Sequence, residues 1–473
     1  MADSKSKEKE PSGLKKSLRL IYVYAIAAGA IFTFIGYWDT IFYEYCGAGT
    51  FFGFILMTLL ILPIAMVYCE LAPLFPKAGG ELIYNTVGIN RHVGFFSSWL
   101  IMAAWIAVPP SAVMAIVQWM FHVLHVNSSF FLIEGVALVA LVGYCCLSLQ
   151  NVEIAGKIQL YMLIFAIAGC IVATVAFLFS GVWSFDNFKN FFYSQVGSHF
   201  GIPSWIIGMA LLITPFFGFE TVPQMVEEGD FPIKDSNKAI LGSIVSCGVV
   251  YSLFFFGLGG MPVQSLVEEG GAAVNGFLAI TMMEQLGGGW SVFAVIFGIA
   301  AILCAIGTCL LGFWLSTVRL MYAMGENNFL PKAFTKLNSH QQPVLPNILL
   351  LIISLVFLLL QNATTFMNDF FNLMSFGCAC AYALTMISAM RIHKKYPNWV
   401  SPYKLKGGNF TRVLALIIAV VIAFFCTLGQ SAGSWKSFGI YLGVGVLLWL
   451  WMVLVNWKKH PVEIETVEGL KKF

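Results

Sequence analysis

The sequence predicts an all-α integral membrane protein with twelve transmembrane helices. Of its 473 residues, 59% are hydrophobic and only 10% are charged, whereas soluble domains carry about 25% charged residues. Two long apolar stretches, one from Leu20 to about Cys46 and one from Trp205 to Val226, are interrupted by Gly, Ala or Pro. Because Gly loosens a helix and Pro removes a backbone donor, the first and sixth helices are expected to be broken.

Twelve segments have the roughly 20 mostly apolar residues that a bilayer-spanning helix needs. They begin near Leu20, Gly49, Gly94, Ser129, Gly156, Pro203, Ala239, Gly289, Val344, Phe366, Arg412 and Ser437. The predicted parts of the chain are an N-terminal tail, a first five-helix repeat, a second five-helix repeat, a loop with the last two helices, and a C-terminal tail. Their ranges are 1–19, 20–180, 181–390, 391–457 and 458–473.

The positions of Lys and Arg predict the orientation in the membrane. If the N-terminus is inside, only Lys189 and Lys436 of the 26 Lys and Arg residues fall in external loops. Cytoplasmic loops of membrane proteins carry an excess of these residues. We therefore expect a multi-pass protein of the cell membrane with both termini in the cytoplasm.

The two broken helices predict a binding site. They run in opposite directions across the membrane, so five helices from each would form an inverted repeat. A break at mid-bilayer depth leaves main-chain N–H and C=O groups without helical partners, and these groups can bind a solute. The pattern is typical of secondary transporters of small solutes.

Four motifs occur in the order known from one superfamily. They are YCELAPLFPKAGGE at 68–81, FFGFE at 216–220 with Glu227-Glu228 after it, RLMYAM at 319–324 with LPK at 330–332, and SPYKLKGG at 401–408. Together they resemble the amino acid–polyamine–organocation (APC) superfamily of transporters. The resemblance implies a LeuT-like fold with two helices after the inverted repeat, alternating access, and an amino acid or related small amine as substrate.

The resemblance also implies which residues bind the substrate. In relatives the first helix breaks at G-x-G-I-F, which corresponds to residues 28–32 here, and its N–H groups bind the substrate carboxylate. Backbone carbonyls of the two breaks would meet the ammonium group, and phenylalanines of the sixth helix would wall the pocket. The full predicted set is Ile26, Ala28, Gly29, Ala30, Ile31, Thr214, Pro215, Phe216, Phe217, Gly218, Phe219, Thr308 and Ser375.

One departure from the family pattern keeps the substrate class open. Both outer glycines of the first motif are alanines, Ala28 and Ala30. Alanine favours continued helix, and its methyl group crowds the approach of a carboxylate. A carrier of polyamines or biogenic amines, or an exchanger of an amino acid for the related amine, is therefore the alternative to an amino acid carrier.

Two acidic residues near the breaks are candidates for coupling or attraction of the solute, because charges in lipid cost about 3 kcal/mol or more. Glu220 follows the sixth-helix break and matches a Glu that is linked to proton dependence in the family's arginine/agmatine exchangers. It would carry a proton, or alternatively cap the second half-helix. Asp39 would lie in an external vestibule and attract cationic solutes, or alternatively reach water at the interface.

The expected coupling ion is H⁺ rather than Na⁺. Thr308, midway along the eighth helix, could supply an oxygen to a sodium site, but a hydroxyl bonded back to its own helix is the competing interpretation. The fifth helix has no Lys between Tyr161 and Thr174, so the lysine that serves proton coupling in some relatives has no counterpart there.

Other function classes lack support in the sequence. No clustered metal ligands, nucleophile elbow or P-loop is present, so we expect no enzyme activity, no metal and no cofactor. The expected partners are the small-molecule substrate and the lipid bilayer, without nucleic acid, and the sequence leaves the oligomeric state open. A non-transporting receptor is the less favoured alternative, since no soluble signalling domain is expected.

Overall fold

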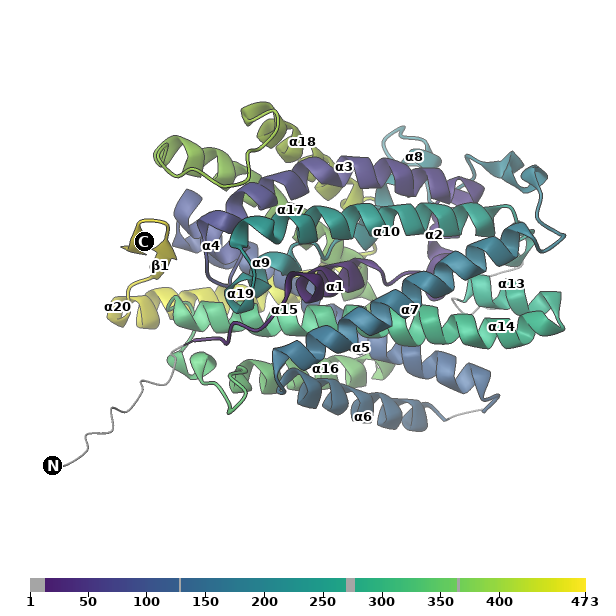
Figure 1. Cartoon of the computed structure of the whole chain (residues 1–473), viewed down its shortest axis with the longest axis horizontal. Coiled ribbons are helices and arrows are strands. Elements are labelled where there is room, and N and C mark those ends of the chain that lie inside the picture. Colours follow the sequence, from purple (N-terminus) through teal and green to yellow (C-terminus); the bar gives the residue numbers. More distant parts are fainter. Residues whose placement is uncertain (1–12, 127–128, 269–276, 364–365) are drawn as a thin grey trace.

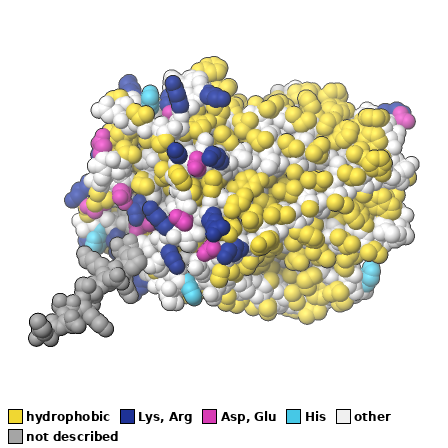
Figure 2. All heavy atoms as spheres, in the orientation of Figure 1, with side chains coloured by type: hydrophobic (Ala, Val, Ile, Leu, Met, Phe, Trp, Pro, Cys, Tyr) yellow, Lys and Arg dark blue, Asp and Glu magenta, His cyan; other side chains and the backbone are white. Residues whose placement is uncertain are grey.

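The computed structural model describes residues 13–126, 129–268, 277–363 and 366–473 as a bundle of long helices (Figure 1). In these residues, ten helical segments are long and apolar enough to cross a membrane. Two further apolar helices, Leu20–Ile31 and Val344–Leu360, are shorter. A broad hydrophobic belt covers the middle of the face seen in Figure 2. The chain is therefore a multi-pass membrane protein.

The helices of the first half are α1 (Leu20–Ile31), α2 (Asp39–Cys46), α3 (Thr50–Leu71), α4 (Glu81–Gly88), α5 (Arg91–Val123), α6 (Phe130–Ser148), α7 (Val152–Leu178), α8 (Ser204–Leu211), α9 (Thr221–Met225) and the 3-10 turn η5 (Val226–Glu228). Those of the second half are α10 (Ser236–Gly259), α11 (Gln264–Glu268), α13 (Leu278–Leu286), α14 (Gly289–Gly298), the π-helical η7 (Ile299–Ile306), α15 (Gly307–Glu326), α16 (Val344–Ala363), α17 (Phe366–Lys395), α18 (Asn409–Thr427), α19 (Ala432–Trp451), the π-helical η9 (Met452–Asn456) and α20 (Trp457–Lys459).

The first predicted break exists, but it lies later than expected. Helix α1 continues through residues 28–31, and the non-helical segment runs from Phe32 to Trp38. Gly36 and Trp38 have positive φ values of 83° and 63°, which turn the chain before α2. The expectation of a break at Ala28–Ala30 is corrected here, because alanine favours the helix and the N–H groups of these residues stay within it.

The second predicted break lies where the sequence placed it. Helix α8 ends at Leu211, a 3-10 turn (η4) covers Thr214–Phe216, and α9 begins at Thr221. Pro215 supplies no N–H, and Gly218 has a φ of 144°, which residues with a side chain rarely adopt.

The second break meets the last turn of helix α1 in the centre of the bundle. Helix α1 packs against α7, α10 and α15. A Cβ atom at Gly218 would lie 2.9 Å from Cβ of Ala30, and one at Gly29 would lie 2.8 Å from Cβ of Thr308 on α15. The close approach of these backbones therefore depends on glycine at both positions.

One end of the molecule gathers most of the Lys and Arg side chains visible in Figure 2. We call this region the basic end. It contains Leu18, Lys77, Glu228 and a hairpin formed by residues 463–472. The hairpin consists of β1 (Glu463–Thr466) and β2 (Gly469–Lys472), which pair antiparallel, and Val462 and Ile464 bury their side chains beneath it. The expectation of an all-α chain with a simple tail at 458–473 misses this hairpin, because a strand pair of this length leaves little periodic signal.

Candidate functional site

A small cavity lies between the two breaks. Its volume is about 30 Å³, while one water molecule needs roughly 10–15 Å³ of such space. An amino acid does not fit, so a solute of that size requires the cavity to widen. The lining residues are Ala30, Thr33, Phe34, Trp38, Ala104, Val108, Thr214, Phe217, Cys309, Phe313 and Met374.

Three of the predicted binding residues, Ala30, Thr214 and Phe217, line this cavity. Ser375 on α17 lies beside them, since its hydroxyl donates to Oγ1 of Thr214 over 3.3 Å. Residues that were predicted on three separate helices thus lie together at this cavity, and their role in substrate binding stays a prediction. The other lining residues were missed, because the register of α5 and α15 facing the breaks carries no sequence signal.

The remaining predicted residues pack around the cavity without lining it. Ile26 lies inside helix α1, so its carbonyl is not the free acceptor that was expected. The hydroxyl of Thr308 donates to the carbonyl of Ala305 over 2.7 Å, which matches the back-bonded alternative. Phe216 packs on Phe54, with ring centroids 6.1 Å apart. Ala28, Gly29 and Ile31 lie in the last turn of helix α1, and Pro215, Gly218 and Phe219 lie in the second break.

Tyr251 on α10 satisfies the unwound backbone of the first break. Its hydroxyl donates to the carbonyl of Ile31 over 2.8 Å and accepts from the N–H groups of Thr33 and Phe34 over 3.1 and 3.2 Å. The side chain is fully buried. Two N–H groups of the break therefore already have a partner, and a substrate carboxylate that used them would have to displace this hydroxyl.

Glu220 is fully buried directly after the second break. Its Oε2 accepts from the N–H of Gly218 over 2.7 Å and from the hydroxyl of Tyr382 over 2.9 Å, and its Oε1 accepts from Nε1 of Trp105 over 3.2 Å. Glu220 occupies the N-cap position of α9, but its side chain turns back to the break and does not cap that helix. All three donors are neutral, so the carboxyl is held by hydrogen bonds alone.

Asp39 is also buried, at the start of α2. Its two carboxylate oxygens accept from the N–H groups of Leu278 and Ala279, over 3.0 and 3.1 Å, at the beginning of α13. The expectation that Asp39 lines an open vestibule is corrected by this contact. The carboxylate instead ties α2 to α13.

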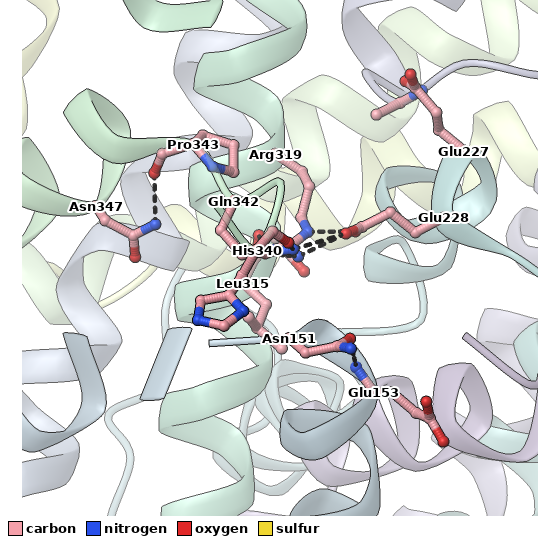
Figure 3. A network of polar contacts seen from close by, with 12 residues as sticks. Asn151, Glu153, Glu227, Glu228, Leu315, Arg319, His340, Gln342, Pro343 and Asn347 are labelled. Carbon is pink, nitrogen blue, oxygen red and sulfur yellow. Dashed lines mark hydrogen bonds and ion pairs between the residues drawn. The ribbon is translucent and has the colours of Figure 1, made fainter. Parts of the chain in front are cut away.

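A buried ion pair joins α15 to the end of η5 (Figure 3). Nε and Nη2 of Arg319 on α15 donate to the two carboxylate oxygens of Glu228, over 2.6 and 3.0 Å, and Nη2 also donates to Oε1 of Gln342 over 2.7 Å. The main-chain carbonyl of Glu228 accepts from the N–H groups of Ser17 and Leu18. The N-terminal segment and α15 are thus both attached to the end of the sixth predicted helix.

A second attachment holds the neighbouring residue. Oε1 of Glu227 accepts from Nζ of Lys77 over 3.0 Å, and its Oε2 accepts from the N–H of Ala78 over 3.2 Å. Lys77 also lies 4.0 Å from Oε2 of Glu465 in the hairpin. The motif residues at 77–81 and 227–228 were recognised from the sequence, but their pairing was not, because it joins segments about 150 positions apart.

Comparisons with known proteins agree with this architecture. The sequence model of the family described as amino acid permease matches residues 18–451. The chain is 25% identical to the glutamate/serine transporter AimA of Bacillus subtilis, over 87% of this chain and 80% of that one. It is 25% identical to the gamma-aminobutyric acid permease of the same organism, over 70% of each, and 24% identical to its methylthioribose transporter, over 95% and 94%. These relatives are transporters and not enzymes, and the chain belongs to the amino acid permease family of the APC superfamily.

Proposed function

We propose that the chain is a secondary active transporter that moves an amino acid or a related small amine across the cell membrane by alternating access. The observation that carries the proposal is the small cavity between two broken helices, where Gly218 meets Ala30. Unwound main chain at such a position binds solutes in transporters with inverted repeats. The sealed basic end is consistent with one closed state of an alternating cycle.

The topology follows from the same proposal. If α1 with α2, and α8 with α9, each form one broken span, and α16 forms another, the chain has twelve spans. Five spans from the first break and five from the second make an inverted repeat of the LeuT-like kind, followed by α18 and α19. The basic end would then face the cytoplasm, since cytoplasmic loops carry the excess of Lys and Arg.

Proton coupling through Glu220 is part of the proposal. An ionised carboxylate only accepts hydrogen bonds, whereas a protonated one also donates. Glu220 now accepts from the N–H of Gly218, within the second break. A proton on Oε2 would compete with this bond and release the break, so proton binding and the shape of the cavity would be linked.

The amine alternative has one specific observation in its favour. The hydroxyl of Tyr251 already occupies the N–H groups of Thr33 and Phe34, and the cavity lining named above contains no Lys, Arg or His. A solute without a carboxylate would leave these contacts intact. Two of the three relatives named above are transporters of glutamate and serine or of gamma-aminobutyric acid, which carry a carboxylate, and the third is a methylthioribose transporter. The amino acid therefore remains the first candidate.

Uptake into proteoliposomes tests the proposal. The purified full-length protein is reconstituted and supplied with radiolabelled L-glutamate, L-serine, L-leucine or gamma-aminobutyric acid, with an acidic exterior. We expect saturable uptake of at least one solute, which an uncoupler abolishes. Failure of every solute to accumulate would contradict the amino acid assignment.

Matched pairs separate the two substrate classes. Lysine with cadaverine and tyrosine with tyramine differ only in the carboxylate. An amino acid carrier prefers the first member of a pair, and an amine carrier the second. To detect exchange, the liposomes are preloaded with one member of a pair. An exchanger would release this solute only after the other member is added outside.

A further inference from the structure

The turn between α3 and α5 places a second carboxyl in the protein interior. Glu81, the first residue of α4, is fully buried. It lies between the apolar segments Asp39–Leu74 and Arg91–Val123, outside both of them. Its Oε2 accepts a hydrogen bond from Nε2 of Gln224 over 3.3 Å, while Oε1 has no hydrogen-bond partner in the described part of the chain.

No positive charge compensates this carboxyl. Across residues 13–126, 129–268, 277–363 and 366–473, no Lys, Arg or His forms an ion pair with Glu81. Lys77, in the same turn, pairs with Glu227 instead. An isolated buried carboxylate is costly, and such a group neutralises by holding its proton. Burial accordingly raises the pKa of Glu81 to about 8.

The groups that face Glu81 from the neighbouring elements are neutral or acidic. They are Tyr68 on α3, Tyr84 on α4, Cys378 on α17 and Glu220 before α9. The hydroxyl of Tyr68 lies beside the Glu81 carboxyl, and it too forms no regular hydrogen bond in the described residues. Two buried polar groups with incomplete hydrogen bonding thus lie next to each other, where the hydroxyl favours the ionised carboxylate, and buried groups of this kind need an explanation.

Glu81 and Glu220 are joined by a row of aromatic residues. The hydroxyl of Tyr382 bonds to Glu220 over 2.9 Å. The rings of Tyr382 and Tyr68 are 5.8 Å apart, and both pack on Phe219. The two carboxyls are close enough to repel each other when both are ionised. Ionisation of one therefore favours the protonated form of the other.

Glu81 is also attached to the segment that seals the basic end. Gln224, Glu227 and Glu228 lie within about one helical turn of α9 and η5. Gln224 bonds to Glu81, Glu227 to Lys77, and Glu228 to Arg319. Movement of this one turn would break all three contacts together and expose Glu81 to water.

Gly80 makes the contact with Gln224 possible. A Cβ atom at this position would lie 2.6 Å from Nε2 of Gln224. Gly80 also has a φ of 40°, which favours glycine. The turn is therefore shaped so that the amide reaches the carboxyl and covers it.

We propose that Glu81 is a second proton-binding site of the transporter, protonated while the basic end is closed and deprotonated when that end opens. On opening, the O–H bond of the carboxylic acid breaks, the proton passes to water at the basic end, and the carboxylate remains. After that end closes, the carboxylate takes up one proton that reaches it from the opposite side by way of Glu220, so each cycle moves one proton toward the basic end. This inference rests on the alternating access proposed above.

Infrared spectroscopy tests the inference directly. The full-length protein in nanodiscs is titrated from about pH 6 to about pH 9.5, a range that spans the raised pKa and lies above that of an ordinary Glu. The C=O band of protonated carboxyls is recorded. We expect wild type to lose part of this band within the range, and Glu81→Gln to lack that titrating component. The matched control is Glu153→Gln, at an exposed ion pair with Lys157, which should titrate as wild type does.

Further variants keep the test decisive. Glu220→Gln removes the repelling neighbour, so the Glu81 component should move to lower pH. Tyr68→Phe removes a hydroxyl that favours the ionised Glu81 carboxylate, so the Glu81 component of the band should titrate at higher pH. This variant replaces Glu81→Gln if Glu81→Gln does not fold. Glu228→Gln weakens the closed end and should move the component to lower pH. An unchanged titration in Glu81→Gln, or in Tyr68→Phe as its replacement, would overturn the inference.

Transport assays distinguish this inference from the proposed function. With labelled L-serine or L-glutamate, Glu81→Gln should keep exchange between equal concentrations on both sides and lose uptake driven by a pH gradient. Absence of any transport in wild type would contradict the proposed function and leave the infrared result standing. Gradient-driven uptake that persists at the wild-type rate in Glu81→Gln would contradict only the role of Glu81.

Discussion

Arg319 and Glu228 form an ion pair in which both side chains are fully buried, with 2.6 Å between Nε and Oε2. Gln342 accepts a further bond from the same guanidinium (Figure 3). A buried pair of this kind contributes less by its attraction than it costs when one partner is removed, because the other charge is then left uncompensated.

The first prediction concerns this pair. Arg319→Ala should lower the free energy of unfolding by about 3–5 kcal/mol, since Glu228 would remain buried without a counter-charge. The double variant Arg319→Met with Glu228→Met should be closer to wild type, because both charges are gone. Thermal denaturation of the purified variants in one detergent measures both.

Arg391→Ala is the control, because Arg391 is exposed at the end of α17. Its melting temperature should stay close to that of wild type. Equal losses in the single and double variants would show that side-chain packing, and not the uncompensated charge, dominates the effect.

The second prediction concerns the contact between Gly218 in the second break and Ala30 in helix α1. Gly218→Ala requires a φ of 144° that alanine rarely adopts, and its methyl group would lie 2.9 Å from Cβ of Ala30. Uptake into proteoliposomes should be abolished. The control is Gly439→Ala on α19, where a methyl group meets no atom within 4 Å, and it should leave uptake unchanged. Normal uptake by Gly218→Ala would rule out the tight approach of the second break to helix α1.

The third prediction concerns the hydroxyl of Tyr251. Tyr251→Phe removes the acceptor of the Phe34 N–H, whereas the N–H of Thr33 keeps its bond to the carbonyl of Ile31 over 3.0 Å. An unsatisfied buried group costs about 1–3 kcal/mol. The melting temperature should fall, and the substrate concentration that gives half-maximal uptake should change.

The direction of that second change is informative. If a substrate carboxylate competes with the Tyr251 hydroxyl for the N–H groups, removal of the hydroxyl should tighten binding of that substrate. An amine without a carboxylate should bind no better to Tyr251→Phe than to wild type. Tyr161→Phe is the matched control, since Tyr161 is 71% exposed. A melting temperature for Tyr251→Phe equal to that of wild type would argue against the three hydrogen bonds.

The fourth prediction is a pH dependence of stability that comes from Glu81. Burial raises its pKa from 4.5 to about 8, so between these values the folded state binds a proton that the unfolded state has released. Stability therefore falls as pH rises through this window, by up to about 1.4 kcal/mol per pH unit where the difference is one full proton. Melting temperatures between about pH 5 and pH 8 should fall less steeply in Glu81→Gln than in wild type.

Two checks accompany this measurement. Glu153→Gln should reproduce the wild-type slope, because the Glu153 carboxylate is partly exposed and pairs with Lys157 over 2.9 Å, whereas Glu81 is buried without a counter-charge. A slope in Glu81→Gln equal to that of wild type would mean that Glu81 is not the group responsible.

The breaks show what the sequence can and cannot predict. Pro215 and Gly218 disrupt a helix by their own chemistry, so the second break was placed correctly. Ala28 and Ala30 favour helix, and the first break moved to Phe32–Trp38, where Gly36 permits a positive φ. Local residue preferences thus decided both outcomes, and only the family analogy placed the first break too early.

Contacts between distant segments were beyond sequence reasoning. Tyr251 bonds to a backbone group 218 positions away, and Glu81 bonds to Gln224 across 143 positions. Each depends on the rotation of one helix against another, which hydrophobic periodicity does not fix when helices are apolar all round. Ser375 was predicted only as a residue that lines the pocket, and its hydrogen bond with Thr214 was not predicted.

The C-terminal hairpin has a practical consequence for producing the protein. Lys471 lies over the rings of Tyr396 and Trp399, and the N–H of Phe473 bonds to the carbonyl of Val462. A fluorescent reporter or affinity handle fused directly after Phe473 would be joined to this hairpin, in which Oε2 of Glu465 lies 4.0 Å from Nζ of Lys77. Fusion proteins used in expression screens should therefore be compared with the untagged protein, because they extend the hairpin that contributes Glu465 to the Lys77 ion pairs.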